Sequence, residues 1–160
     1  MDNEEQVKRI EAFINDFLLI ELEKVQTADL KVMQFILMGQ TIEVLGSILD
    51  NKPMKARGQS AFRFSKAINY LFGGRYRLLN DNLFLYDKLR NQMVHTFIPS
   101  KDLILLTSNK DDKYRHLEYF DDKLVLISDI FYEDIKKACH LLLKRIKQGK
   151  VKSKNIAFEN

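Results

Sequence analysis

The chain has 160 residues, 46% of them hydrophobic and 30% charged, a size and composition typical of one soluble globular domain. No apolar run approaches the ~20 residues that a transmembrane helix needs, so we expect no membrane partner. The acidic N-terminus is unlike a signal peptide, and the single Cys139 cannot form an internal disulfide. We therefore expect a cytoplasmic protein of bacterial type.

Apolar residues recur at spacings of three and four before Pro99, which predicts helices. The expected helices cover about 3–24, 28–50, 59–72 and 81–98. The second is apolar nearly all round, which is typical of the central helix of a bundle. Lys, Pro and Gly between 51 and 58 predict a loop, and Gly73 and Gly74 are expected to end the third helix.

After Pro99 the helical spacing gives way to short apolar runs separated by polar turns. The runs lie at about 103–107, 114–120 and 124–127. Together they predict a small antiparallel β-hairpin or meander over about 103–127.

A last helix is expected at about 129–148, with Ser128 or Asp129 as its cap, and residues 149–160 are expected to form a basic, flexible tail. No repeat or linker divides the chain, so residues 1–148 are predicted to form a single domain. The predicted fold class is mainly α, an antiparallel helical bundle with the small β-meander inserted before the last helix.

Positive charge is unevenly spread along the chain. No Asp or Glu occurs between Asn51 and Asn80, and a second basic run follows Leu143. The candidate contacts for an anionic partner are Lys55, Arg57, Arg63, Lys66, Arg75 and Arg77. A surface of one sign attracts the opposite charge, so an anionic partner fits this pattern. The alternative is that these cations pair with acids on neighbouring helices and coat a solvated face.

The expected fourth helix carries Arg90, Asn91 and His95 close together. A permanent cation and a side chain that titrates near neutral pH are the two types that RNA cleavage can use without a metal ion. On a regular α-helix Asn91 and His95 share a face, whereas Arg90 and His95 lie about 140° apart. One helix therefore does not direct both side chains to one point, but a second copy across a two-fold axis would complete the site.

The segment from Leu85 to His95 resembles the signature helix of the HEPN superfamily, in which an arginine and a polar residue are followed by a histidine. Arg90, Asn91 and His95 carry this match, with four residues between the arginine and the histidine. The resemblance implies a helical bundle. For many members it also implies a homodimeric, metal-independent ribonuclease, often a toxin or defence effector.

The resemblance also implies roles for these residues and partners for the chain. His95 would be the general acid or base that takes the proton of an RNA 2′-OH. Arg90 would stabilise charge on the phosphorane-like transition state, and Asn91 would orient His95 or bind the phosphate. No cofactor or metal is expected. The expected partners are a second copy, RNA guided by the basic segment, and a cognate antitoxin or regulatory protein.

The alternative is a non-catalytic HEPN-like interaction or nucleotide-binding module in which Arg90 is structural. Arg90 would then pair with Asp87 one turn earlier, or with Glu43 of the central helix. Glu43 is a lone carboxylate on a very apolar helix and therefore needs a cation beside it. Arg63 is the other candidate for that cation. The role of His95 would then be only that its protonated ring interacts favourably with the C-terminal end of the helix dipole.

The remaining candidates for chemistry fit no motif. The spacing of His116 and His140 with His95 matches no metal site, so these histidines are expected to be ordinary surface residues. Cys139 is expected to be a small core residue, although Lys136 and Lys137 nearby could make its thiol slightly more acidic.

Overall fold

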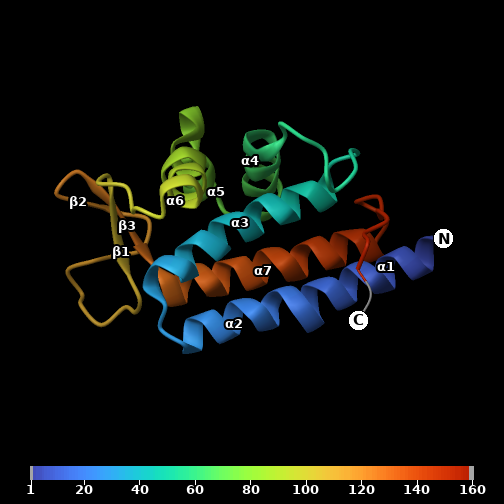
Figure 1. Ribbon diagram of the computed structural model, residues 1–160, viewed down its shortest axis with the longest axis horizontal. Helices are drawn as coiled ribbons and strands as arrows, with labels where there is room; N and C mark the ends of the chain where they lie inside the picture. Colours follow the sequence, from blue (N-terminus) through green and yellow to red (C-terminus); the bar gives the residue numbers. More distant parts are fainter. Residues whose placement is uncertain (1, 159–160) are drawn as a thin grey trace.

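The computed structural model describes residues 2–158, which form a mainly helical protein with a small sheet at one end (Figure 1). The long helices are α1 (Asn3–Ala12), continued by the π-helical η1 (Phe13–Leu18) and α2 (Leu19–Thr27), then α3 (Lys31–Leu49), α4 (Ser60–Leu71) and α7 (Ser128–Lys147). The shorter helical segments are α5 (Gly74–Leu79), η2 (Asp81–Leu83), η3 (Tyr86–Asn91) and α6 (Gln92–Thr96). The strands are β1 (Leu103–Leu106), β2 (Tyr119–Phe120) and β3 (Lys123–Ile127).

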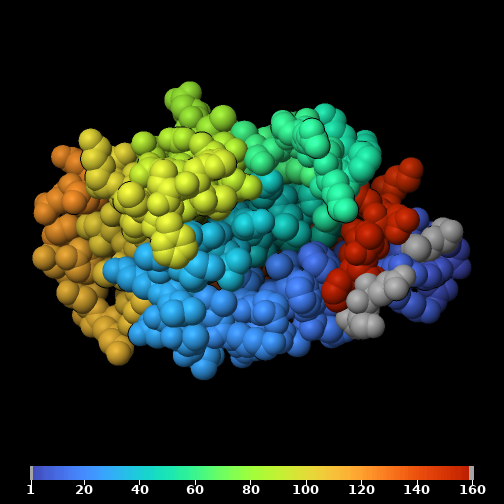
Figure 2. Space-filling model, in the orientation of Figure 1, coloured from blue at the N-terminus to red at the C-terminus, as the bar shows by residue number. Residues whose placement is uncertain are grey.

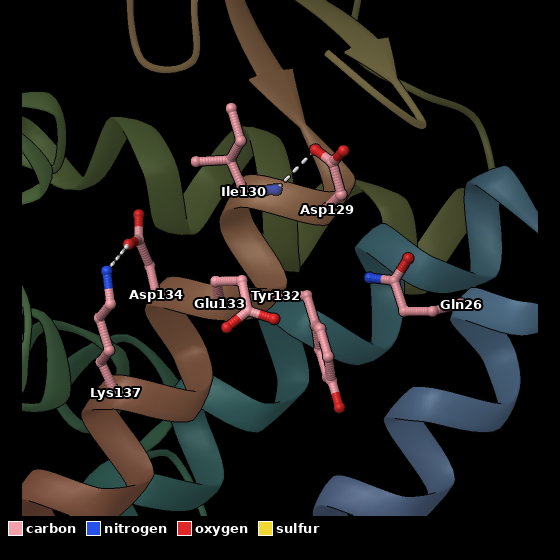
Figure 3. A pocket seen from close by; sticks show the side chains of 7 residues that line it. All are labelled: Gln26, Asp129, Ile130, Tyr132, Glu133, Asp134 and Lys137. Carbon is pink, nitrogen blue, oxygen red and sulfur yellow. Dashed lines mark hydrogen bonds and ion pairs between the residues drawn. The ribbon is translucent and has the colours of Figure 1, made fainter.

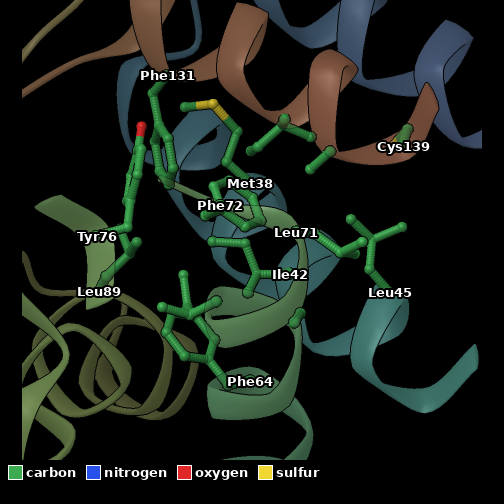
Figure 4. Packing of buried hydrophobic residues seen from close by; sticks show 14 of the residues in the cluster. Met38, Ile42, Leu45, Phe64, Leu71, Phe72, Tyr76, Leu89, Phe131 and Cys139 are labelled. Carbon is green, nitrogen blue, oxygen red and sulfur yellow. The ribbon is translucent and has the colours of Figure 1, made fainter. Parts of the chain in front are cut away.

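Helix α3 is the centre of the bundle, as its apolar sequence predicts. It packs against α2, α4, α7 and η3. Figure 4 shows Phe64 of α4, Leu89 of η3 and Phe131 of α7 meeting around Met38 and Ile42 of α3. By length and composition alone α3 could cross a membrane, but 67% of that segment is buried inside the protein, as expected for the core helix of a soluble protein.

Two glycines of α3 face neighbouring helices, and one of them allows a very close approach. A Cβ added to Gly46 would lie 1.8 Å from the carbonyl oxygen of Arg63, so the backbone of α4 touches α3 there. A Cβ added to Gly39 would lie 3.4 Å from the Leu89 side chain and 3.5 Å from Arg90 Cα. A Cβ at Gly39 would therefore be in ordinary van der Waals contact, so only Gly46 requires glycine, while Gly39 lies directly beneath the helix that carries the Arg90–His95 motif.

The expected helices over 3–24 and 81–98 each contain a wider π-helical turn, and the second also begins late. Its core residues Leu85, Leu89 and Met93 are all buried, at a constant spacing of four. A regular α-helix would rotate them progressively away from one face, whereas a π turn corrects that drift. Asn82 and Leu83 have left-handed backbone conformations (φ of 51° and 61°), so the regular helix starts only after them.

The third helix and the following glycines differ in one respect from the prediction. Helix α4 matches the expected range, and the loop before it is present. However, Gly73 also precedes a further short helix, α5, whose residues Tyr76 and Leu79 are buried. Six residues are too few for a clear apolar period, which is why the sequence pattern missed this helix.

The predicted β-hairpin or meander is confirmed only in part, because β2 and β3 form an antiparallel hairpin but β1 makes the sheet mixed. The strand order is β1-β3-β2, with β1 parallel to β3 and β2 antiparallel to it. The central strand β3 has a continuous run of buried residues, Leu124 to Ile127, and such runs are typical of strands that are covered on both faces. The last helix then follows β3 directly. Ser128 and Asp129 do not cap it through a side chain, and the Ser128 hydroxyl instead lies 2.7 Å from Gln26 Oε1.

The described part of the expected flexible tail is anchored to the bundle. The Lys154 ammonium group donates to Asp50 Oδ1 at 2.7 Å and to the Lys52 carbonyl at 2.6 Å, at the end of α3. Ile156 is buried, and the Phe158 ring packs edge-on against Phe13 at 5.3 Å. The buried carboxylate of Asp50 at the end of α3 binds Lys154, and this contact explains why the described part of the tail packs against the bundle. Residues 159 and 160 of the expected tail lie outside the described residues.

Candidate functional site

The Arg90–His95 motif lies where η3 passes into α6, on the helix packed over Gly39 of α3. Leu89 and Met93 point into the core and fix the rotation of this helix (Figure 4 shows Leu89). The helix stops at Phe97, which has a left-handed conformation with φ of 60°. The motif therefore sits on a short helix whose inner face is held firmly and whose end is exposed.

Arg90 pairs with Glu43 of the central helix, which is one of the two partners that the structural alternative offered. Arg90 Nε lies 2.5 Å from Glu43 Oε2, and the two side chains are only 12% and 18% exposed. The other carboxylate oxygen, Oε1, accepts a hydrogen bond of 2.8 Å from the Ser60 hydroxyl of α4. Glu43 thus joins three segments of the bundle: α3, α4 and η3.

Asp87 and Asn91 interact with each other on the outer side of the helix. Asn91 Nδ2 lies 3.5 Å from Asp87 Oδ1, a long hydrogen bond between exposed atoms. The other oxygen of Asp87, Oδ2, lies 3.6 Å from Lys88 Nζ, and Lys88 also contacts Asp102 at 3.2 Å. Asp87 is therefore not the ion-pair partner of Arg90.

His95 lies on a different side of the helix from Arg90. Its side chain is exposed, whereas Arg90 is directed inward to α3. Around His95 the apolar side chains of Val94, Phe97 and Ile98 are 37%, 57% and 64% exposed. A single chain therefore exposes His95 among apolar sequence neighbours, without bringing it to the Arg90 guanidinium.

The basic segment does not form a uniform RNA-binding surface, because Arg63 is buried. Its Nε donates to Asp50 Oδ2 at 2.6 Å, and its Nη atoms donate to the carbonyl oxygens of Met54 and Pro53, each at 2.7 Å. Arg63 thus holds the loop after α3 in place and is not available to a phosphate backbone, which corrects its predicted role. It also cannot serve as the partner of Glu43.

The carboxylate of Asp50 stays charged in this buried position because of its partners. Burial by itself raises its pKa, but hydrogen bonds from Arg63, Lys154 and the Lys52 backbone together lower the pKa below the usual value. The sequence pattern did not single out Asp50, which is the last acid before the basic segment.

The other predicted basic contacts remain at the surface. Lys55, Arg57 and Arg77 are exposed, and Lys66 is half-buried. Arg75 is exposed as a residue, although its Nε donates to the Leu117 carbonyl at 3.0 Å. The described structure thus leaves these residues accessible to an anionic partner.

A buried polar network lies between α5, the segment before β2 and α7. The Tyr76 hydroxyl donates to Asp134 Oδ2 at 2.7 Å and lies 2.9 Å from His116 Nε2. The backbone N–H of Ile127 donates to His116 Nδ1 at 2.9 Å, so the Nε2 atom of the neutral ring carries the proton and donates to Tyr76. Burial lowers the pKa of His116 to about 4, although Asp134 opposes this shift.

This network corrects the expectation that His116 is an ordinary surface residue, since its side chain is 7% exposed. Its partners are 40 and 11 residues away in the sequence, so no local pattern could reveal them. Tyr76 binds both His116 and Asp134, while the other oxygen of Asp134 faces Lys137 at 3.8 Å; hydrogen bonds of this kind between separate elements stabilise a fold. Cys139 behaves as predicted for a core residue, because burial raises the pKa of its thiol to about 12.

One hollow of the surface is unsuitable for a phosphate because of the charges that line it. The one beside the start of α7, shown in Figure 3, is lined by Gln26, Asp129, Ile130, Tyr132, Glu133, Asp134 and Lys137. Its single lysine lies 3.8 Å from Asp134 Oδ1. Because carboxylates dominate this hollow, it repels an RNA backbone. Within residues 2–158, no three His, Cys, Asp or Glu side chains come together as a possible metal site.

The comparison with family models, curated proteins and solved structures gave no match to this chain. The relation to the HEPN superfamily therefore remains a resemblance, carried by Arg90, Asn91 and His95 on a helical bundle.

Proposed function

We propose that this chain is a metal-independent endoribonuclease of the HEPN type that acts as a homodimer. The observation that carries the proposal is the position of the motif. Arg90 forms a mostly buried ion pair with Glu43, while His95, five residues later, is exposed to solvent at the end of the same helix. A fixed cation and an accessible imidazole are the groups that metal-independent RNA cleavage requires.

Each residue has a distinct part in the proposed reaction. His95 takes the proton of the 2′-OH, whose oxygen then attacks the adjacent phosphorus. The bond from phosphorus to the 5′-oxygen breaks, and the protonated imidazole returns its proton to that oxygen. Because the Glu43 contact uses Nε, the two Nη groups of Arg90 are the part of the guanidinium that would bind the phosphate oxygens. The products are a 2′,3′-cyclic phosphate and a 5′-OH end, and DNA resists because it lacks the 2′-OH.

The exposed apolar residues beside His95 supply the reason for a dimer. Val94, Phe97 and Ile98 are all exposed near His95 in the sequence, and in the proposed dimer a second copy covers them in an isologous contact. Such a contact places His95 of one protomer near the helix of the other, and so overcomes the separation of Arg90 and His95 within one chain.

The test is cleavage of end-labelled single-stranded RNA in excess EDTA by the parent and by His95→Ala. His140→Ala is the matched control, because His140 is another exposed histidine, on α7. We expect the parent and His140→Ala to cleave equally, leaving cyclic-phosphate ends, and His95→Ala to be inactive. Cleavage that survives His95→Ala would overturn the assignment of His95.

The second candidate is a non-catalytic interaction or nucleotide-binding module, and the Arg90–Glu43 pair favours it. An arginine that joins α3 to η3, beside a carboxylate that also binds Ser60, has a sufficient structural reason to be present. Absence of cleavage across several RNAs, together with a loss of stability in Arg90→Ala, would favour this module over the ribonuclease. A regulatory partner protein, such as an antitoxin, fits either candidate.

A further inference from the structure

The outward face of α4 carries two large aromatic side chains in solvent. Phe62 and Tyr70 are 56% and 55% exposed, and Lys66 lies midway between them. At ~100° per residue these three positions fall within about 80° of the helix surface, over roughly 12 Å of its axis. The buried residues Phe64, Ala67, Ile68 and Leu71 occupy the opposite face. Core packing therefore does not account for Phe62 and Tyr70.

Each exposed ring has a cation beside it. Lys66 Nζ lies 5.7 Å from the centre of the Phe62 ring, and the Arg145 guanidinium carbon lies 5.9 Å from the centre of the Tyr70 ring. Arg145 is also held in place, because its Nη1 donates to the Tyr70 carbonyl at 2.5 Å. Within residues 2–158, neither Lys66 nor Arg145 forms an ion pair with a carboxylate.

The contact between Tyr70 and Arg145 joins two parts of the chain that contain no acid. Residues 51–80 have no Asp or Glu, and neither have residues 135–158. Asp50, the acid just before the first of these segments, is buried and bound by Arg63 and Lys154. The fold thus brings two basic segments together around exposed aromatic rings. Figures 1 and 2 place α4 at the surface, on the side of the molecule away from α2.

We infer that this face of α4, defined by Phe62, Lys66, Tyr70 and Arg145, binds single-stranded nucleic acid. Unpaired bases stack on exposed aromatic rings, and neighbouring cations bind the phosphates between them. A duplex would not fit in the same way, because its bases are already stacked inside the helix. The absence of acids from both segments provides the charge complementarity for a polyanion. The surface would deliver a strand to the proposed ribonuclease, but binding to it does not depend on cleavage.

The test measures fluorescence anisotropy of labelled fifteen-nucleotide strands, U15 and dT15, at low and high salt. For U15 the His95→Ala background keeps the RNA intact, and for dT15 the parent chain is used. We expect binding of both strands to weaken as salt rises. Phe62→Ala and Tyr70→Ala should each weaken binding at least about fivefold, since stacking on one ring stabilises a complex by roughly that factor or more. Lys66→Ala should reduce the salt dependence of binding.

Tyr119→Ala is the matched control. Tyr119 is an equally exposed tyrosine, 55% accessible, but it lies on β2, away from α4 (Figure 1). Its substitution should leave the affinity within about twofold of the parent, because a surface change away from the interface has little effect. All three aromatic positions are exposed, so the variants are expected to unfold at the same temperature as the parent.

The outcomes separate this inference from the proposed ribonuclease. If Phe62→Ala and Tyr70→Ala bind both strands as tightly as the parent, or if the parent binds neither strand at low salt, the inference is overturned. If dT15 binding depends on both rings while no RNA is cleaved, the surface stands and the ribonuclease proposal fails. Binding of U15 alone, still dependent on both rings, would support the surface and assign it to RNA.

Discussion

Removing the Arg90 side chain tests whether the motif helix depends on Glu43. Arg90→Ala keeps the Cβ that packs beside Gly39 but leaves the Glu43 carboxylate without its cation. Loss of one partner of a buried pair costs about 3–5 kcal/mol. Because Arg90 and Glu43 retain 12% and 18% exposure and Ser60 still donates to Glu43, we expect the lower end, about 3 kcal/mol.

The assay is thermal unfolding followed by circular dichroism. For a chain of this size, 1 kcal/mol shifts the melting temperature by about 2–4 °C, so Arg90→Ala should lower Tm by about 6–12 °C. Arg77→Ala is the control, because Arg77 is an exposed helical arginine and its loss should change stability by less than about 0.5 kcal/mol.

A double-mutant cycle distinguishes the ion pair from general packing. Glu43→Ala combined with Arg90→Ala should cost less than the two single changes added together, because the double variant leaves no uncompensated charge. The expected coupling is about 1–3 kcal/mol. Additive losses, or a melting temperature of Arg90→Ala within 2 °C of the Arg77→Ala control, would refute a structural role for the pair.

Three further changes test other contacts of the fold. Gly46→Ala should destabilise the chain by about 3 kcal/mol or more in urea unfolding, because its Cβ would lie 1.8 Å from the backbone of α4. Gly39→Ala should be nearly neutral, because a Cβ there would be 3.4 Å from its nearest neighbour. Equal effects of the two substitutions would contradict this packing. Tyr76→Phe should cost about 1–3 kcal/mol by leaving His116 and Asp134 without their shared hydroxyl, and an unchanged urea midpoint would count against the network. Burial lowers the pKa of His116 from its ordinary value of 6.5 to about 4 in the folded chain. Between these pH values the unfolded chain binds a proton that the folded chain does not, so stability falls as the pH drops from 6.5 towards 4, by up to about 3 kcal/mol. Urea unfolding at pH 7 and pH 4.5 checks this, with His116→Gln expected to show a smaller pH dependence.

The sequence predicted the candidate site only in part. The positions of Arg90, Asn91 and His95 on one helix follow from the local pattern, and the pairing of Arg90 with Glu43 was one of two alternatives for a charged residue on an apolar helix. The sequence did not reveal that Arg63 is withdrawn from the surface by Asp50, because the distance of 13 residues between them spans a loop whose path the sequence does not define. It also did not reveal the network around His116, whose partners come from three separate elements.

By itself the sequence determined the long helices, the approximate positions of the strands and the two basic segments without acids. These features depend on the spacing of neighbouring residues, since helical and strand periodicities act over a few positions. Only the tertiary structure decided that β1 pairs in parallel with β3, that Arg63 turns inward, that Lys154 anchors the tail, and that Arg145 reaches Tyr70 across 75 positions. Such contacts depend on how whole elements pack around α3. A buried charge without a partner is costly, so each one pairs with a group that this packing places close to it.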